Sequence, residues 1–443
     1  MKTRLNYQYQ ITIFLFISII VFSTSSLIAQ NENEELKLNI QIRPRTEFRN
    51  GLFTPILEGQ KPAFFIGQRT RIGLNYSKNK KLQIGLSTQV VTTWGNDPQV
   101  QSTANDISLY EAWAQLHFNQ AWSLKIGRQV LSYVDERILG KLDWNNAGRK
   151  HDAALLQYEK NKFKGNLVFA FNQNSEKVTN TFYDNSLSQP YKDMELFWMK
   201  YEFTKSISAS VLAMNLGFQS PSDSSSSHLQ TIGTNLYYKN NKVDISGTYY
   251  YQSGSSAVVN ASKTKTNAWM AAAKAGYSFN KNVSFGIGSD YLSGRVMNAP
   301  ASKNTFFNPL YGTGHKFYGF MDYFYVSSAH HNVGLWDSYL NLALNNAEKL
   351  SWQIALHHFE SAAQVINYSG GKANAALGNE VDLTFNYKLM NEVKLSGGCS
   401  QMFTDPSMGF VKNVLPVQKM KSVQNWVWLS INFNPEILMY KSK

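Results

Sequence analysis

Two pairs of arginines near the start of the chain have the clearest chemistry: Arg43 with Arg45, and Arg69 with Arg71. The members of each pair are two positions apart, so in an extended segment both point to the same side. A guanidinium group binds a carboxylate through two parallel hydrogen bonds, whereas a lysine ammonium acts as a mobile point charge. The arginines therefore predict a surface that handles anions. Further cations expected on it are Lys125, Lys200 and Lys274.

Acidic residues are expected on the same surface and leave two interpretations open. Alternating signs would let an anion leave as well as enter. Alternatively, the acids pair with the arginines in a network that stiffens the protein. The acids concerned are Glu47, Glu111 and Glu202, with Asp290 and Asp382 farther along the chain.

The segment Ser132–His151 is dense in charges of both signs, which predicts an ordered polar network. It could form a gate or a selectivity constriction, but a loop held by its own salt bridges is an equal alternative. Its charged residues include Asp135, Glu136, Arg137, Lys141, Asp143 and Arg149, with Trp144 among them.

Patterns that would indicate catalysis or metal binding are sparse. The adjacent histidines His330–His331 and His357–His358 would point to opposite faces of a strand, so neither pair supplies two ligands to one metal ion. The motifs G-x-S-x-G, H-E-x-x-H, C-x-x-C and a phosphate-binding loop do not occur. We therefore expect no enzymatic activity, no metal and no cofactor.

Segment after segment alternates apolar and polar residues with a period of two, which is typical of β-strands that face different media on their two sides. Between Phe64 and Tyr76, one side carries Ile72 and Leu74 while the other carries the second arginine pair. The apolar side of each strand therefore requires an apolar environment, and the polar side requires an aqueous one.

Eight short polar connectors join these strands in pairs, as hairpin turns do. They are residues 78–81, 119–121, 160–162, 204–206, 239–242, 280–282, 346–349 and 390–392. With an opening strand near 36–49 and a closing strand near 424–433, they predict about eighteen strands. An even number with short turns at one end and long loops at the other is typical of an antiparallel transmembrane β-barrel. A soluble tandem of β-domains is the alternative, but it would need apolar residues on the polar side too.

Three features fit this pattern less directly. The stretch Lys316–Val326 has no short-turn partner, so we expect it within a long loop, folded inward as a constriction. Ala347–Ile366 could be an amphipathic helix, although its position after a turn favours a strand. Arg128 shares the apolar side of its strand, so a bulge or the aqueous end of the strand must accommodate its charge.

The composition supports an exported protein rather than a disordered or nucleic-acid-binding one. Aromatic residues make up 14% of the 443 residues, charged residues only 16%, and the formal net charge is +13. Basic residues followed by a short apolar run predict a signal peptide over residues 1–29, an uncleaved anchor being the alternative, and one barrel domain over 30–443. The single cysteine, Cys399, allows no internal disulfide.

Two segments, Gly127–Tyr158 and Phe317–Leu340, resemble the alginate-export family of outer-membrane porins in its Bacteroidetes-like version. The resemblance implies an eighteen-stranded barrel in the bacterial outer membrane, with an electropositive interior that passes an acidic polysaccharide. The residues expected at the pore or its constriction are Arg43, Arg45, Arg69, Arg71, Lys125, Arg128, Arg137, Arg149, Lys200 and Lys274. Their expected acidic partners are Glu47, Glu111, Asp135, Glu136 and Glu202.

The function expected from these features is passive export or uptake of an acidic polysaccharide or oligosaccharide such as alginate, or of other organic anions. A plugged barrel that binds a ligand without transporting it is the alternative. Expected partners are the anionic solute, outer-membrane lipids and lipopolysaccharide, and periplasmic export proteins, but not nucleic acid.

Overall fold

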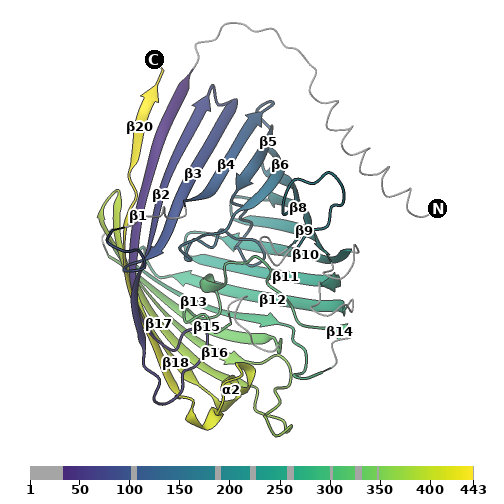
Figure 1. Cartoon of the computed structure of the whole chain (residues 1–443), viewed down its shortest axis with the longest axis vertical. Helices are drawn as coiled ribbons and strands as arrows, with labels where there is room; N and C mark the ends of the chain where they lie inside the picture. The colour runs from purple at the N-terminus through teal and green to yellow at the C-terminus, as the bar shows by residue number, and fades with distance from the viewer. Residues whose placement is uncertain are drawn as a thin grey trace, which may run out of the picture.

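The computed structural model describes residues 33–100, 107–184, 191–219, 226–256, 264–299, 303–324, 332–346 and 349–442. Within them, twenty strands belong to one sheet that closes on itself, as Figure 1 shows. The expected signal peptide, residues 1–29, lies outside the described residues. None of the helices in these ranges is long and apolar enough to cross a membrane.

The strands follow one another around the wall in chain order. The first half comprises β1 (Glu34–Asn50), β2 (Ala63–Lys78), β3 (Leu82–Thr93), β4 (Ser108–His117), β5 (Trp122–Gln129), β6 (His151–Lys160), β7 (Phe163–Phe171), β8 (Asp193–Glu202), β9 (Ile207–Gln219) and β10 (Ser226–Lys239). The second half comprises β11 (Val243–Ser256), β12 (Thr264–Ser278), β13 (Val283–Leu292), β14 (Lys303–Asn304), β15 (Leu335–Asn346), β16 (Leu350–Glu360), β17 (Ala376–Met390), β18 (Val393–Thr404), β19 (Val423–Phe433) and β20 (Glu436–Lys441). The helical segments are η1 (Gly314–Lys316), α2 (Pro406–Val411) and η2 (Val417–Lys419).

Eighteen of these strands form the wall, as predicted. Of the other two, β14 has only two residues, and β20 continues the direction of β19 along β1 after a break at Asn434 and Pro435. All eight short connectors predicted from the sequence join consecutive antiparallel strands of the wall. Within the segment 347–366, expected to be a strand or a helix, Leu350–Glu360 forms the strand β16 and residues 361–366 lie beyond it.

The first and last strands close the barrel, because a sheet in a membrane cannot leave an open edge. β1 pairs with β19 through partners such as Thr46 with Leu429 and Phe48 with Val427. In Figure 1 the yellow C-terminal strand accordingly lies beside the purple N-terminal strand.

The closing pair allows a direct test. Cysteines placed at Thr46 and Leu429 in a Cys399→Ala background should be joined by oxidation or by a short bifunctional thiol reagent, because the structure makes the two residues direct partners. We expect a product that keeps its compact gel mobility after boiling. A matched pair displaced by six residues, Thr46 and Val423, should give little product. Equal yields from both pairs would contradict the register.

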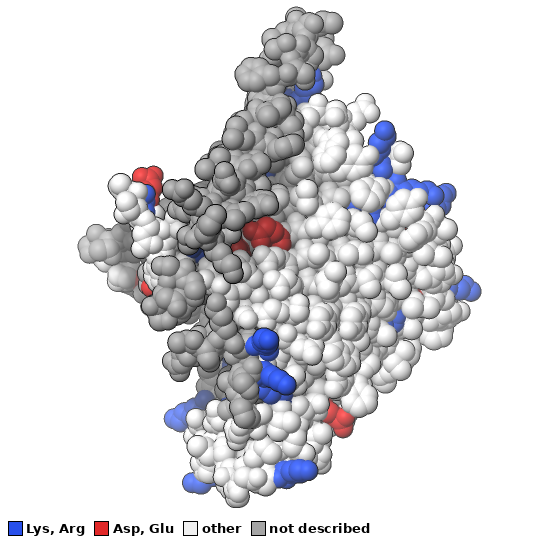
Figure 2. Space-filling view, turned by 90° about the vertical axis from the view of Figure 1, so that its right-hand side faces the viewer, with Lys and Arg blue, Asp and Glu red and all other residues white. Residues whose placement is uncertain are grey.

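The two faces of the wall differ as the period of two predicts. In β2, Phe64 and Ile72 on the outer face are 69% and 50% exposed, whereas Arg69 on the inner face is 1% exposed. The face seen in Figure 2 is largely uncharged, with Lys and Arg mostly toward its margins. The wall thus presents apolar side chains outward and polar ones to the interior, which we call the lumen.

Two long connections fold into the lumen and are packed there. One is the connection between β5 and β6, which we call the inner loop (residues 130–150). The other leads from β14 through residues 305–324 and contains part of the stretch for which we expected an inward fold. Both contribute buried apolar residues, including Ile138, Leu139, Phe307 and Met321. Residues 325 and 326 lie outside the described part of the chain.

Candidate functional site

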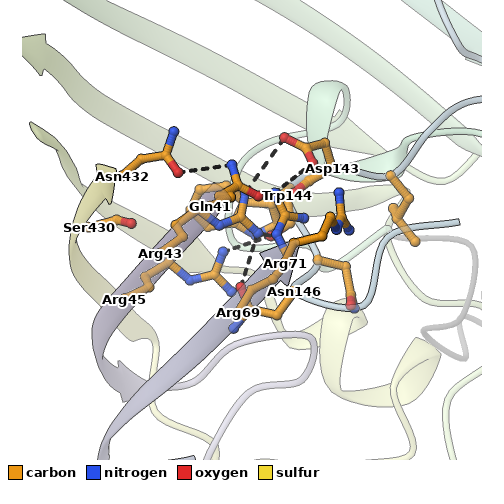
Figure 3. A network of polar contacts seen from close by, with 12 residues as sticks. Gln41, Arg43, Arg45, Arg69, Arg71, Asp143, Trp144, Asn146, Ser430 and Asn432 are labelled. Atoms are coloured by element: carbon orange, nitrogen blue, oxygen red, sulfur yellow. Dashed lines mark hydrogen bonds and ion pairs between the residues drawn. The ribbon is translucent and has the colours of Figure 1, made fainter. Parts of the chain in front are cut away.

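Four arginines gather on one wall of the lumen, on β1 and β2 (Figure 3). Strand pairing sets Arg43 opposite Arg69 and Gln41 opposite Arg71. Residues directly opposite each other in an antiparallel pair share a face, so all four predicted arginines project inward. We call this set the arginine wall: Arg43, Arg45, Arg69 and Arg71.

The arginine wall is partly neutralised by one buried acid, Glu47. Its carboxylate accepts hydrogen bonds from Arg45 Nε at 2.9 Å, Arg49 Nε at 3.0 Å and the indole of Trp426 at 3.0 Å. Because Glu47 is only 2% exposed, this part of the network is structural. In this structure Arg45 is therefore paired with an acid.

The inner loop supplies the second acid. Asp143 Oδ1 lies 2.9 Å from Arg69 Nη2, and Asp143 Oδ2 lies 3.6 Å from Arg43 Nη1. Burial alone would raise the pKa of Asp143, but the guanidinium groups of Arg69 and Arg43 outweigh it and hold that pKa below its ordinary value of 3.8. Asp143 is therefore ionised at neutral pH.

Backbone carbonyls of the inner loop complete its attachment to the wall. Arg43 donates to the carbonyl of Asp143 at 2.9 Å, and Arg45 donates to that of Trp144 at 2.8 Å. Gln89 on β3 donates to the carbonyl of Ala147 at 2.8 Å. The side-chain amide oxygen of Asn146 also accepts from Arg43 at 3.0 Å, so four neutral acceptors and one carboxylate hold this loop against β1, β2 and β3.

Trp144 fixes the tip of the inner loop by ring contacts. The guanidinium of Arg45 lies 4.1 Å from its ring centroid, and His315 stacks on it at 4.1 Å with an interplanar angle of 12°. Trp428 meets it edge-on at 4.8 Å. Such contacts add about 0.5–1.5 kcal/mol each beyond area burial, so Trp144 joins the arginine wall to the second inward segment.

Positive charge on the arginine wall exceeds what its acids compensate. Within the described residues, Arg43 Nε, Arg69 Nε and Arg69 Nη1 are buried without a hydrogen-bond partner. A cavity of about 290 Å³ lies alongside, lined by Arg69, Arg71 and Asp143 together with Trp113 and Glu111. Uncompensated positive charge beside a cavity attracts an anion into that cavity.

One predicted residue lines this cavity and another lies beside it, both on neighbouring strands. Lys125 on β5 lies 3.7 Å above the ring of Trp113, and Glu111 on β4 lines the cavity itself. The guanidinium of Arg71 lies 3.4 Å from the ring centroid of Tyr110. It donates a hydrogen bond of 2.7 Å to Gln89, which fixes its orientation. The arginines thus have a rigid support.

A second group of charges lies where the inner loop meets β13. Arg137 is bonded to Asp290 through both terminal nitrogens, and its Nε lies 2.8 Å from Asp135. Arg137 is buried, and its pKa is raised well above the ordinary value because the attraction of Asp290 and other groups outweighs the burial that lowers it. A cavity of about 450 Å³ adjoins this pair and is lined by Lys274, Tyr339 and His357 among others.

The lumenal side of β15 and β17 carries a second group of acids, of which the sequence analysis expected Asp382 but not Glu380 or Asp337. Glu380 and Asp382 on β17 are buried and accept the backbone N–H groups of Met321 at 2.8 Å and Phe320 at 3.4 Å. His357 is hydrogen-bonded to Asp337 at 2.9 Å. The only signal in the sequence was the spacing of two between Glu380 and Asp382, and nothing local showed that an inward segment would bind them.

The remaining predicted residues lie apart from these groups. Lys200 and Glu202 on β8 pair with each other at 2.9 Å and line neither cavity. Arg149 donates to the carbonyls of Tyr311 and Gly312, so it ties the two inward segments together. Glu136 accepts a hydrogen bond from Ser132 at 2.9 Å.

The assignment of Arg128 to the pore was wrong. It lies on the outer face opposite Asp152, with which it forms two hydrogen bonds of 2.8 Å. The register of β5 with β6 continues through Arg128 without a bulge, so the pairing, near the loop ends of both strands, is what accommodates its charge. It contacts no lumenal cavity.

The histidines behave as strand geometry requires. His357 points inward with its side chain 10% exposed, whereas His358 points outward and is 49% exposed. His330 and His331 lie outside the described residues. Among the residues that the structure describes, no group of three or more His, Cys, Asp or Glu side chains is placed to hold a metal ion.

A half-buried lysine gives the docking of residues 305–324 a pH dependence. Lys412, just after α2, donates to the carbonyl of Tyr323, and burial lowers its pKa to about 7. If residues 305–324 separate from Lys412, the pKa of this lysine returns toward 10.5. Protonation therefore favours separation, and docking strengthens as the pH rises from about 7 to 10.5.

The unfolding temperature of the wild-type protein in detergent should rise over this pH range. In Lys412→Met the unfolding temperature should not change with pH over the same range. A wild-type slope retained in the variant would contradict this role.

The closed barrel of strands with an apolar outer face, a charged interior and inward loops defines the class of outer-membrane channels. A family model described as alginate export matches residues 35–403, so the chain belongs to the alginate export family. No curated protein matches the chain in sequence. The protein resides in the outer membrane, and the short turns accordingly face the periplasm.

Solved structures share the fold at low sequence identity. OpdK of Pseudomonas aeruginosa has a TM-score of 0.60 at 9% identity, covering 91% of this chain and 99% of its own. OccAB4 of Acinetobacter baumannii has a TM-score of 0.59 at 11% identity, covering 91% and 98%. A structure of OpdK with vanillate has a TM-score of 0.59 at 9% identity, covering 91% and 99%. The family and the fold indicate a channel rather than an enzyme.

Proposed function

We propose that the protein is an outer-membrane channel for passive passage of organic anions, of which acidic oligosaccharides and polysaccharides such as alginate are the favoured class. The observation that carries this proposal is the arginine wall. Four guanidinium groups point inward, those of Arg69 and Arg71 line a cavity of about 290 Å³, and three nitrogens of Arg43 and Arg69 have no acceptor within the described residues. Guanidinium groups so placed favour carboxylates over neutral or cationic solutes.

Two comparisons support the same chemistry. The family is described by the export of alginate, a polymer of sugar acids. The fold neighbour OpdK is known with vanillate, which is also a carboxylate. In this proposal the outer wall contacts lipids and lipopolysaccharide, and periplasmic proteins deliver or receive the solute.

A plugged binding barrel is the second candidate, and the packed inward segments favour it. The inner loop and residues 305–324 fill much of the lumen with buried apolar side chains. In that case the arginine wall would recognise an anion without conducting it.

Liposome swelling separates the two candidates. Vesicles containing the purified protein should swell faster in an oligouronate than in a neutral oligosaccharide of equal length. The rates should converge as salt is raised, because salt screens lumenal charges over about 8 to 10 Å near physiological strength. No swelling in either solute would support the plugged barrel, and faster swelling in the neutral sugar would refute anion preference.

A further inference from the structure

We infer that the Asp143 carboxylate occupies the position on Arg43 and Arg69 that a solute carboxylate takes, so that the inner loop carries a tethered competitor which an acidic solute displaces. This inference rests on the proposed function and adds to it a defined carboxylate subsite and the means by which it is regulated.

The exposure of the three groups supports a competitor rather than a buried structural pair. The side chain of Asp143 is 46% exposed, whereas those of Arg43 and Arg69 are 12% and 1% exposed. Asp143 also lines the cavity of about 290 Å³. The carboxylate therefore covers the two cations on the side of the cavity, and Figure 3 shows it beside the arginine side chains.

The bonds of the inner loop to the wall separate into two kinds. Arg43, Arg45 and Gln89 hold it through neutral backbone carbonyls, and Arg43 also through the amide oxygen of Asn146. Within the described residues, Asp143 alone gives Arg43 and Arg69 a negative partner in an ion pair. A free carboxylate can replace that side chain with no change in charge and leave the backbone bonds in place. Exchange is therefore cheaper than breaking a buried pair, which would leave a charge without a partner.

The cavity indicates the size of the ligand. About 290 Å³ is at the lower end of the range for ligand pockets, so it suits one sugar-acid unit rather than several. Trp113 offers an aromatic wall, and Gln41 and Asn39 offer amides for hydroxyl groups. The ligand class is accordingly a monocarboxylate, such as a single uronate residue of a longer chain.

Tethering sets the concentration at which exchange occurs. A group on a short flexible linker already acts at an effective concentration of the order of millimolar, and the bound backbone of the inner loop holds Asp143 closer than such a linker would, so a free uronate must exceed that concentration to compete. Removing the competitor should therefore tighten uronate binding, whereas removing a purely structural carboxylate would weaken the site.

The test uses single channels of the full-length protein in planar bilayers, with glucuronate as the blocking solute and glucose as the neutral control of equal size. Asp143→Asn should lower the glucuronate concentration for half-maximal block at least about tenfold. Glu136→Gln is the matched control, because it removes an acid from the same loop that touches neither arginine. It should leave the block unchanged, and glucose should block none of the variants.

Three outcomes would overturn the inference. They are an unchanged block in Asp143→Asn, a weaker block, and an equal gain in Glu136→Gln. If Asp143→Asn fails to fold, Asp143→Glu retains the charge but displaces the carboxylate by one methylene, and it should give a smaller gain in the same direction; no gain would overturn the inference. Reversal potentials in the same bilayers distinguish a failure of the competitor inference from a failure of the proposed function. A wild-type channel without anion preference refutes the proposed function, whereas an anion-selective channel with an unchanged block refutes the competitor alone.

Discussion

Replacing Arg69 and Arg71 with glutamine should reduce the preference of the channel for anions by about tenfold. Two unit charges a few ångströms from a permeating ion contribute about 1 kcal/mol or more each at the effective dielectric of a wet lumen, and each 1.4 kcal/mol is a factor of ten. Glutamine keeps hydrogen-bonding groups, and the pairing of β2 with β1 and β3 holds the wall without the charges. Reversal potential in a salt gradient measures the change.

The matched control for this variant is Lys205→Gln, which removes a cation from a short turn outside the lumen. It should leave the reversal potential unchanged. The competing interpretation, in which the arginines only stiffen the wall, predicts the opposite result. Selectivity would then persist, and the double variant would unfold at a lower temperature because Asp143 loses a partner. That combination would remove these arginines from the proposed transport site.

Arg137→Met should cause the largest loss of stability. It leaves Asp290, which is 1% exposed, without its guanidinium partner. Breaking a buried pair by removing one member costs about 3–5 kcal/mol. We expect the inner loop to detach from β13, which would widen the pore. A lower unfolding temperature and noisier, larger single-channel currents should therefore occur together.

The double variant Arg137→Met with Asp290→Asn tests the cause. It removes both charges, so the stability lost in the single variant should largely return. Asp135→Asn removes the more exposed partner of Arg137 and should cost much less, since that carboxylate is 23% exposed. A double variant as unstable as the single one would show that Arg137 acts by packing rather than by pairing.

Local patterns were sufficient to predict the wall. Alternation of apolar and polar residues marks each strand, and short polar connectors mark each turn, so both follow from neighbouring residues alone. The inward direction of Arg43, Arg45, Arg69 and Arg71 followed for the same reason. These predictions needed no knowledge of contacts between distant segments.

The docking of the inner loop could not be predicted in this way. Asp143 meets Arg69 across 74 residues, and Arg137 meets Asp290 across 153. Such contacts depend on how a long connection packs within the closed barrel. The sequence showed the density of charge in this loop, but not which wall each charge would reach.

Arg128 illustrates a narrower limit. The period of two correctly predicted which face of the strand carries Arg128. It could not predict that Asp152 would be the partner of Arg128. β5 and β6 are joined by the long inner loop, so no turn fixes their register in advance. Without that register, Arg128 was assigned to the pore with other basic residues.

The reversal potential of the purified wild-type protein in a planar bilayer, under a tenfold gradient of potassium chloride, tests the central claim most directly. The arginine wall predicts an open channel that prefers chloride to potassium, with a preference that declines as the mean salt concentration rises. A cation-selective channel, or an anion preference independent of salt, would contradict the claim. Absence of conductance would show instead that the inward segments seal the lumen.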